Sequence, residues 1–187
     1  MQTTDFPYQR ISIIGSTGCG KTTLARTLAD RLALKHIELD GLYWEANWTG
    51  STREIFRARV EQAICAPGWV CDGNYRAVRD LLWPNAQAVI WLDYAFTTIF
   101  LRLLRRTWRD WRTQEPLCNG NHEQFWRHFK LWSNESIFGW LIKTYAMRRR
   151  EYPELFLRPE NQHLAVLHFK TPAGTQAWLE SMREVRL

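Results

Sequence analysis

One short stretch of the sequence constrains the fold more than any other: a glycine-rich loop that ends in a lysine and a threonine. Residues 15–22 read Gly-Ser-Thr-Gly-Cys-Gly-Lys-Thr and satisfy the pattern G-x-x-x-x-G-K-[ST]. An apolar run precedes this loop and a helical pattern follows it. In that context, successive backbone N–H groups curl around a phosphate at the positive end of the helix. The segment therefore predicts a phosphate-binding loop between a strand and a helix.

The rest of the chain alternates between short apolar runs and longer segments with helical spacing. The runs expected to form strands are 10–14, 36–39, 69–71, 88–92 and 163–169. The segments expected to be helical are 21–33, 52–66, 77–83, 96–112, 123–150 and 172–184. Strands separated by helices form right-handed crossovers and a parallel sheet that is covered on both faces. The sequence thus predicts an α/β fold, a five-stranded parallel sheet flanked by helices, in a single domain over residues 1–187.

The loop and the start of the next helix supply the residues expected to bind a nucleotide. Lys21 can reach the β- and γ-phosphates, and the hydroxyl of Thr22 is a ligand for Mg²⁺. The expected binding set is Gly15, Ser16, Thr17, Gly18, Cys19, Gly20, Lys21, Thr22 and Thr23. We therefore expect ATP and Mg²⁺ to bind here, with GTP left open in place of ATP.

Bound Mg²⁺ also requires a carboxylate from a neighbouring strand end, and two aspartates compete for this place. Asp93 follows the longer apolar run but leads directly into a segment with a packing pattern. Asp72 follows a shorter run and precedes the polar loop residues Gly-Asn-Tyr-Arg. We favour Asp72, with Asp93 as the alternative.

Composition and charge limit the class of protein. The net charge is +6, and residues 102–150 hold eleven Lys and Arg against four Asp and Glu. This basic segment fits a bound polyphosphate, a nucleic acid or a solvated face. The four cysteines form no CxxC pair, which argues against a zinc or disulfide framework. The first ten residues lack the apolar core of a signal peptide and no run approaches ~18 apolar residues, so a cytoplasmic protein without a membrane span is expected.

Several motifs occur in the order found in one known group of proteins. They lie at residues 13–25, 37–44, 69–76, 89–94 and 102–109. With these motifs, most of residues 1–110 resembles the adenylate-kinase-like P-loop kinases, and more narrowly the bacterial group labelled DNA topology modulation protein, FlaR-related. The combination of Leu-Asp-Gly-x-Tyr-Trp with Asp-Gly-Asn-Tyr is more specific than the P-loop alone.

The resemblance implies a P-loop NTPase fold with strand order 2-3-1-4-5, an acceptor-binding region at 40–66 and a helical, arginine-rich lid at 102–150. It places Asp72 near Mg²⁺ and Arg76 near the phosphate of an acceptor. It also places Lys170 and Thr171 beside the nucleotide base, although a tight turn into a helix that begins at Pro172 explains that loop equally well. Adenylate kinases have Asp-Gly-Phe-Pro-Arg where this chain has Asp-Gly-Asn-Tyr-Arg, so this motif does not fix the acceptor.

The end of the second expected strand carries a candidate catalytic carboxylate. Asp40 at this position could orient or deprotonate an acceptor hydroxyl. The alternative is that Asp40 caps the next helix. Tyr43, Trp44 and Trp48 follow, and they could either stack on a ring of the acceptor or pack this small region onto the sheet.

A stripe of arginines marks the segment after the fourth expected strand. Five of them fall on one side of a helix, at positions 102, 105, 106, 109 and 112. Like charges on one stripe repel one another unless an anion or an acidic partner compensates them. Arg102 and Arg106 are expected to bind phosphate because they lie nearest the sheet. Residues 148–150, three further arginines, could add one contact or form a simple basic patch.

Together these features predict an enzyme that transfers the γ-phosphoryl group of ATP to a small acceptor, with a nucleoside or nucleotide as the first choice. The residues expected to act in the transfer are Lys21, Asp40, Arg76, Arg102 and Arg106. The alternative is a nucleotide-dependent regulator in which the basic segment binds DNA or RNA.

Overall fold

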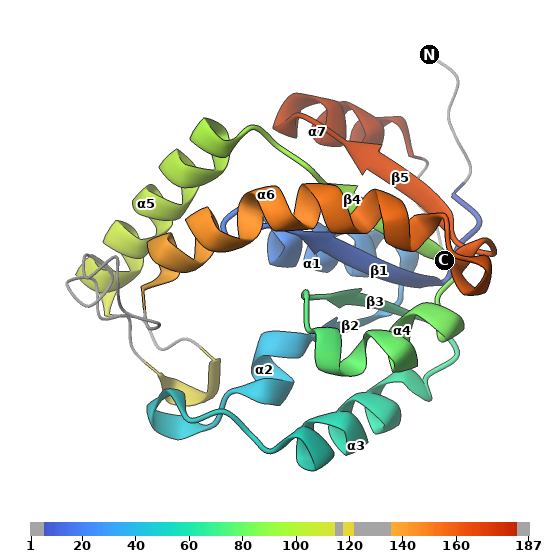
Figure 1. The fold of residues 1–187 in the computed structure, drawn as a ribbon, viewed down its shortest axis with the longest axis horizontal. Helices are drawn as coiled ribbons and strands as arrows, with labels where there is room; N and C mark the ends of the chain where they lie inside the picture. Colours follow the sequence, from blue (N-terminus) through green and yellow to red (C-terminus); the bar gives the residue numbers. More distant parts are fainter. Residues whose placement is uncertain (1–5, 115–117, 122–135, 183–187) are drawn as a thin grey trace.

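The computed structural model describes residues 6–114, 118–121 and 136–182, and it contains one five-stranded sheet (Figure 1). The strands are β1 (Arg10–Gly15), β2 (Lys35–Glu38), β3 (Trp69–Asp72), β4 (Ala88–Leu92) and β5 (Ala165–Phe169). They lie in the order β2-β3-β1-β4-β5, and each neighbouring pair is parallel. The predicted fold class and strand order are confirmed.

Seven α-helices connect and flank the strands of the described part. They are α1 (Lys21–Leu32), α2 (Leu39–Tyr43), α3 (Arg53–Ile64), α4 (Arg79–Asn85), α5 (Phe96–Thr113), α6 (Ile137–Phe156) and α7 (Pro172–Ser181). Short 3-10 turns are η1 (Ala46–Trp48), η2 (Arg76–Val78), η3 (Cys118–Gly120) and η5 (Pro159–Asn161). The helix expected at 123–150 corresponds to α6; its expected start lies outside the described residues, and the expected end at residue 150 is wrong, because α6 continues to Phe156.

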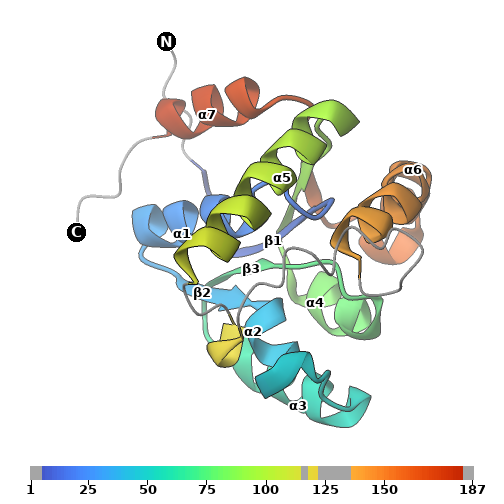
Figure 2. The same ribbon diagram turned by 90° about the vertical axis from the view of Figure 1, so that its left-hand side faces the viewer.

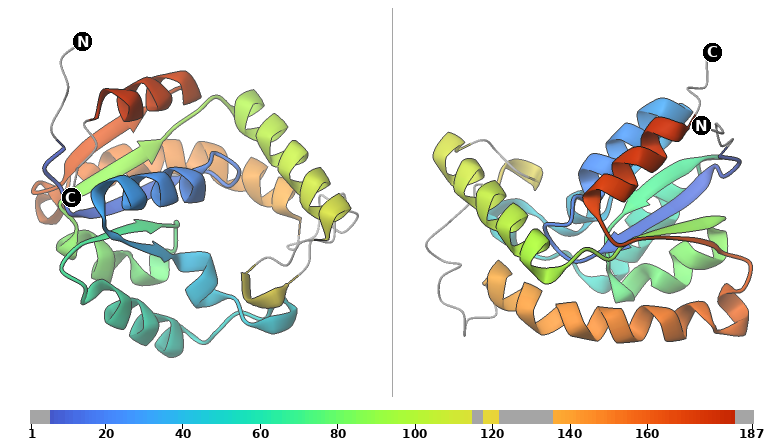
Figure 3. Two further views of the ribbon diagram at one scale, coloured as in Figure 1. Left: turned by 180° about the vertical axis from the view of Figure 1, so that it is seen from behind. Right: turned by 90° about the horizontal axis from the view of Figure 1, so that it is seen from above.

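The sheet separates two hydrophobic layers, which can be followed in Figure 3. Helices α1 and α7 cover one face, where Ile11 and Ile13 of β1 pack with Leu28 of α1. Helices α3, α4 and the C-terminal half of α6 cover the other face, where Trp91 of β4 meets Tyr152 at a ring-centroid distance of 5.6 Å. Burial on both faces is why the central strands are continuous apolar runs in the sequence rather than alternating ones.

The loops that follow the parallel strands meet at the carboxyl edge of the sheet, where open α/β sheets bind their ligands. Helix α5 extends outward from this edge, and α6 runs back towards the sheet (Figures 1 and 2). The first part of α6 packs near α5, through Phe138 and Leu141, whereas its last turns cover the sheet through Tyr152 and Leu155. Helix α6 therefore contacts both α5 and the face of the sheet that α4 covers.

Among the described helices, none combines the length and the apolar character that crossing a bilayer requires.

Candidate active site

The P-loop adopts a conformation that depends on its glycines. Gly18 and Gly20 have φ angles of 79° and 98°, a region that residues with a Cβ rarely adopt. Gly20 is the residue that precedes α1, so the amides of the loop open towards the N-terminus of that helix. A Cβ on Gly18 would lie 2.8 Å from the Cβ of Leu103, which shows how closely α5 packs against the loop. The predicted phosphate-binding loop is therefore present as a strand–loop–helix unit.

Asn74, to which the sequence assigned no role, fixes the start of the loop. The N–H of Gly15 donates to Oδ1 of Asn74 at 3.1 Å, and Nδ2 of Asn74 donates back to the carbonyl of Gly15. Asn74 follows Gly73, whose own N–H donates to the carbonyl of Ile13 at 3.3 Å. Both peptide groups of β1 that lead into the P-loop are thus held by the loop after β3.

Three cations converge on the P-loop. Lys21 Nζ donates to the carbonyls of Gly15 and Ser16 at 3.2 and 3.1 Å. Arg102 of α5 donates to the carbonyl of Cys19 at 3.3 Å. Burial raises the pKa of the Cys19 thiol, and the charges of Lys21, Arg148 and Arg102 act against that rise. Arg148 lies one turn of α6 before Tyr152, which lines a hollow together with Ile14 and Asn74, so this face of α6 is turned towards the start of the loop.

Arg148 of α6 is the most unusual of these cations. Only 8% of its surface is exposed, and its Nη1 is buried without a hydrogen-bond partner in the described part of the chain. Burial lowers the pKa of this guanidinium, against the opposing effect of Tyr152 and Cys19. A buried guanidinium nitrogen without a hydrogen-bond partner is costly, and an anionic ligand at this position would supply the missing partner. The sequence had left residues 148–150 open between this role and a basic patch.

The predicted magnesium residues are brought together. The hydroxyl of Thr22 donates to Oδ2 of Asp72 at 2.7 Å, and His36 Nε2 lies 2.8 Å from Oδ1 of the same carboxylate. Asp72 is 4% exposed. A hydroxyl and a carboxylate oxygen are the hard ligands that Mg²⁺ prefers, so the donor set fits this ion. A second carboxylate, Glu38, ends β2 in register with Asp72. Burial raises the pKa of Glu38, and the negative charge of Asp72 raises it further.

Asp93, the alternative metal ligand, is engaged elsewhere. Arg149 Nη2 donates to Oδ2 at 3.2 Å, and Nε of the same guanidinium forms an ion pair with Oδ1 at 2.8 Å. His168 Nε2 lies 3.0 Å from Oδ2. Asp93 therefore ties the end of β4 to α6 and β5, whereas Asp72 is the carboxylate that meets Thr22.

Asp40 lies on the side of the site expected to bind the acceptor, within the first turn of α2 rather than in a strand. Its carboxylate is exposed and accepts a hydrogen bond of 2.6 Å from the hydroxyl of Tyr75. Burial, with a smaller effect of Asp40, raises the pKa of Tyr75, which keeps the phenol protonated as a donor. Tyr75 thus orients Asp40 towards the open side of the sheet edge.

The aromatic residues after Asp40 pack against one another. Tyr43 contacts Phe56 edge-on at 5.2 Å and Tyr75 at 4.9 Å, and Trp44 contacts Trp48 at 5.6 Å. Of the two hypotheses for this cluster, packing of a small region onto the sheet describes what these rings do. The rings are in mutual contact, so the structure provides no parallel pair between which a substrate ring would insert.

The tip of the expected lid contacts this same region. Trp48 N–H donates to Oδ1 of Asn121 at 2.7 Å, and Nδ2 of Asn121 donates to the carbonyl of Glu45 at 2.9 Å. Asn119 donates to the carbonyl of Gly41 at 3.1 Å. Residues 118–121 and 41–48 therefore lie side by side, as Figure 1 also shows.

Four arginines on the acceptor side have carboxylate partners. Arg76 and Arg79 both contact Glu151 of α6, at 2.5 and 2.9 Å. Two of the three arginines of α3 are also paired: Arg57 with Asp80 at 2.8 Å and Arg59 with Glu45 at 2.7 Å. Burial tends to raise the pKa of Glu151, but the hydrogen bonds from Arg79 and Arg76 outweigh it, and the pKa is lowered.

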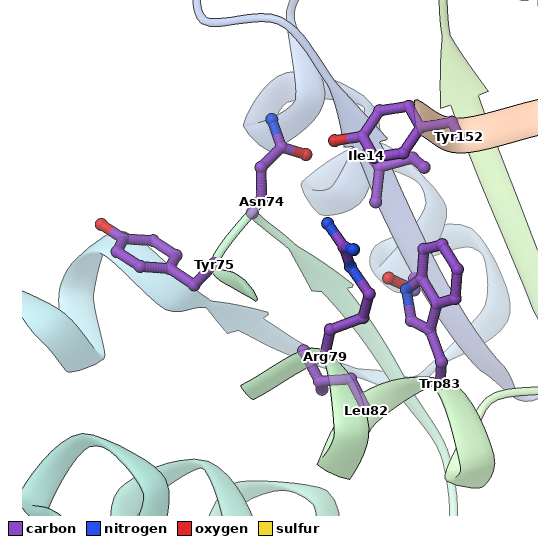
Figure 4. A pocket seen from close by; sticks show the side chains of 9 residues that line it. Ile14, Asn74, Tyr75, Arg79, Leu82, Trp83 and Tyr152 are labelled. Atoms are coloured by element: carbon purple, nitrogen blue, oxygen red, sulfur yellow. The ribbon is translucent and has the colours of Figure 1, made fainter. Parts of the chain in front are cut away.

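A small hollow lies behind Asn74 on the face covered by α4 and α6 (Figure 4). Its cavity volume is about 10 Å³, and it is partly open to solvent. Arg79 extends into it from α4, with its guanidinium 5.2 Å from the ring of Trp83 and 5.9 Å from that of Tyr152. Tyr75 points away from the other labelled side chains, towards α2. The hollow thus connects the P-loop support at Asn74 with α6.

Three further expected residues, Arg106 on a phosphate and Lys170 and Thr171 beside the nucleotide base, remain predictions, and their contacts in this structure are as follows. Arg106 is half-exposed and lies 3.9 Å from Asp110 on its own helix. Thr171 caps α7 by accepting from the N–H of Gly174 at 3.1 Å, and Pro172 begins the helix, as in the alternative reading of that loop. Lys170 is exposed. On the α5 stripe, Arg109 also contacts Asp110, at 2.8 Å.

Comparisons with known proteins agree with this geometry. The family model for shikimate kinase matches residues 17–67, which is less than half of the chain. Solved structures match over nearly all of it. A gluconokinase from Sinorhizobium meliloti 1021 has a TM-score of 0.52 at 16% identity, with 95% of this chain and 93% of that chain covered. A search of curated proteins finds no match.

Two further solved structures are also similar to this chain over nearly its whole length. A shikimate kinase from Bacteroides thetaiotaomicron has a TM-score of 0.51 at 18% identity, covering 92% of this chain and 95% of that one. A sugar kinase from Janibacter sp. HTCC2649 has a TM-score of 0.52 at 18% identity, covering 93% and 91%. These likenesses confirm the fold and agree with the prediction of a P-loop kinase. They give no support to the narrower FlaR-related group or to a nucleoside or nucleotide acceptor.

Proposed function

We propose that this protein transfers the γ-phosphoryl group of ATP to a hydroxyl group of a small molecule. The observation that carries the proposal is the convergence of Lys21, Arg102 and Arg148 on the P-loop, with one guanidinium nitrogen of Arg148 buried and unpartnered in the described structure. A triphosphate supplies the negative charge that these cations lack, and phosphoryl transfer depends mainly on charge neutralisation and alignment.

Different residues of the site bind the phosphates and Mg²⁺. The amides of the P-loop and Lys21 bind the β- and γ-phosphates, while Arg102 and Arg148 approach the same loop from α5 and α6. Thr22 and Asp72 would hold Mg²⁺, with His36 fixing the orientation of Asp72. When bound, Mg²⁺ neutralises charge on the β- and γ-phosphate oxygens.

Asp40 is proposed to orient the acceptor hydroxyl and to accept its proton. The carboxylate is exposed at the sheet edge, and one of its oxygens is fixed by Tyr75, which leaves the other available to a substrate. A general base must lie within hydrogen-bond reach of the proton that it accepts. Asp40 is the exposed carboxylate on this side that the structure orients through a neutral donor.

The pairing of the acceptor-side arginines favours an uncharged hydroxyl acceptor over a nucleotide. A phosphate acceptor needs guanidinium groups that are free to bind it. Arg76, expected to hold such a phosphate, is paired with Glu151. The names of the similar structures, gluconokinase, shikimate kinase and sugar kinase, point to hydroxylated carbon compounds as the acceptor class. A nucleoside belongs to this class only through its ribose hydroxyls.

The proposal is tested by measuring ADP release with Mg·ATP and a panel of acceptors against an acceptor-free background. The panel contains sugars, polyols and hydroxy acids, together with matched pairs of a nucleoside and its monophosphate. Release above background with a hydroxylated acceptor, abolished by Lys21→Ala, is the expected result. If ATP binds but no acceptor raises ADP release, the proposal is wrong.

A further inference from the structure

The ion pair between Asp93 and Arg149 lies one residue along α6 from Arg148, and the proposed function gives it no role. Asp93 is 6% exposed at the end of β4, and its N–H donates to the carbonyl of Phe169 in β5 at 2.8 Å. The carboxylate is therefore anchored to the central part of the sheet. A side chain that pairs with this carboxylate is therefore held in place relative to the strands.

Every nitrogen of the Arg149 guanidinium is engaged. Nε and Nη2 contact the two oxygens of Asp93, and Nη1 donates to the hydroxyl of Tyr145 at 2.9 Å. Tyr145 in turn donates to the carbonyl of Tyr94 at 3.1 Å. A fork-to-fork pair of this kind restricts both distance and direction, which a single contact does not.

A second anchor lies on the other side of Arg148. Successive residues of an α-helix are separated by about 100°, so Arg149 lies about 100° from Arg148 in one direction and Glu151 about 60° in the other. Glu151 is held by Arg76 and Arg79, which belong to the segment after β3. Arg148 thus projects between two anchored side chains, and Arg150, about 200° away, is exposed.

We propose that Asp93 is a positioning residue: by holding Arg149, it restrains the turn of α6 that carries Arg148, so that the Arg148 guanidinium stays directed at the P-loop. This inference rests on the proposed contact of Arg148 with a phosphate of ATP. Without this anchor, the buried contacts of Leu141 and Tyr152 still hold the helix, but the turn between them is less restrained, and the Arg148 guanidinium is held less firmly towards the loop. Asp93, which the sequence offered as the alternative metal ligand, then acts through Arg149 on Arg148.

The inference is tested through nucleotide affinity, which needs no acceptor. Affinities for Mg·ATP and Mg·ADP are measured by calorimetry for the wild type, Arg148→Ala, Arg149→Ala and the double variant, with Arg150→Ala as the matched control. Arg148→Ala is expected to weaken ATP binding about tenfold and ADP binding little, because only ATP carries the γ-phosphate. Arg149→Ala should cause the same selective loss at about three- to tenfold, and Arg150→Ala none.

The double variant separates positioning from a general structural role. In the Arg148→Ala background, loss of Arg149 should cost less than about twofold in ATP affinity, since residues that act through one another are not additive. Additive losses, or equal losses for ATP and ADP, would overturn the inference. If Arg149→Ala does not fold, Asp93→Asn and Arg149→Lys provide the same comparison.

The outcomes also distinguish this inference from the proposed function. Selective, non-additive losses of ATP affinity with no acceptor in the panel would support the positioning role and refute the phosphotransferase. If an acceptor is phosphorylated but the losses of ATP affinity are additive in the double variant, the phosphotransferase is supported and the positioning role is refuted. Failure of the wild-type protein to bind either nucleotide would refute both.

Discussion

The two sides of the site treat their cations in opposite ways. On the phosphate side, Lys21 donates to loop carbonyls, and Arg148 is buried with a nitrogen that has no partner within the described residues. On the acceptor side, Arg76 and Arg59 are each paired with a carboxylate. If the proposed function holds, the buried cation with an unpartnered nitrogen lies where the anionic ligand binds, whereas the carboxylate-paired cations maintain the shape of the fold.

The largest expected effect comes from removing the cation at the centre of the phosphate side. Lys21→Ala should reduce phosphoryl transfer by at least about 10³-fold, because charge stabilisation in the transition state is lost. The fold should be retained, since Lys21 makes only loop contacts. ADP release measures the activity, and circular dichroism on the same sample measures whether the fold is retained. Full activity of Lys21→Ala would contradict the assignment of the phosphate side.

Arg148→Met should separate activity from stability. Transfer should fall about 10²-fold, because a phosphate contact is lost. Stability should rise by about 1 kcal/mol, or about 3 °C in the unfolding midpoint, because a buried, unpartnered charge is replaced by an apolar chain. Thermal unfolding without nucleotide measures the second effect. A loss of stability together with activity would mean that Arg148 is structural, like the acceptor-side arginines.

The acceptor side is tested through Asp40. Asp40→Asn should lower kcat about 10²-fold and leave the affinity for ATP unchanged, since the general base is lost while the phosphate side stays intact. Tyr75→Phe, which removes only the hydrogen bond that orients Asp40, should have a smaller effect of about threefold to tenfold. Steady-state kinetics with the acceptor found in the panel gives both values, and a loss of ATP affinity in Asp40→Asn would contradict the division of the site.

The support of the P-loop gives a smaller effect. Asn74→Ala removes two hydrogen bonds to Gly15 and should lower the free energy of unfolding by about 1–2 kcal/mol. ATP affinity should fall with it, because the loop amides are less well fixed. Chemical denaturation and calorimetry measure the two changes. Asn85→Ala, an exposed asparagine of α4, is the matched control.

The smallest effect concerns the pH dependence of stability at Glu151. Its folded-state pKa is lowered from the ordinary value of 4.5, so its contribution to stability is fully present above pH 4.5 and is lost as the pH falls through the lower folded pKa. Glu151→Gln should therefore unfold at a lower temperature than the wild type at pH 7, and the difference should vanish in acid. Glu154→Gln, an exposed neighbour on α6, should show no such difference at any pH.

The sequence was sufficient to predict the sheet and the P-loop because both follow from short local patterns. The apolar runs are continuous where strands are buried on both faces, and the glycine positions of the loop are fixed by its backbone. The choice of Asp72 over Asp93 for Mg²⁺ remains a prediction, although the structure places Asp72 beside Thr22.

The remaining site residues depend on contacts between distant segments, which no local pattern reports. Asn74 meets Gly15, and Arg148 meets the loop, only once β3 and α6 are placed against β1. Arg106 shows the converse: its partner Asp110 lies four residues further along α5, a spacing that a local pattern does report. The cytoplasmic location and the alternative of DNA or RNA binding remain untested predictions.

The most direct test of the account is a crystal structure with Mg²⁺ and a non-hydrolysable ATP analogue. The account predicts the phosphates within the amides of residues 15–22, with Nη1 of Arg148 within hydrogen-bond distance of a phosphate oxygen. A nucleotide bound in that loop while Arg148 keeps its Nη1 unpartnered, or a nucleotide bound elsewhere, would contradict it.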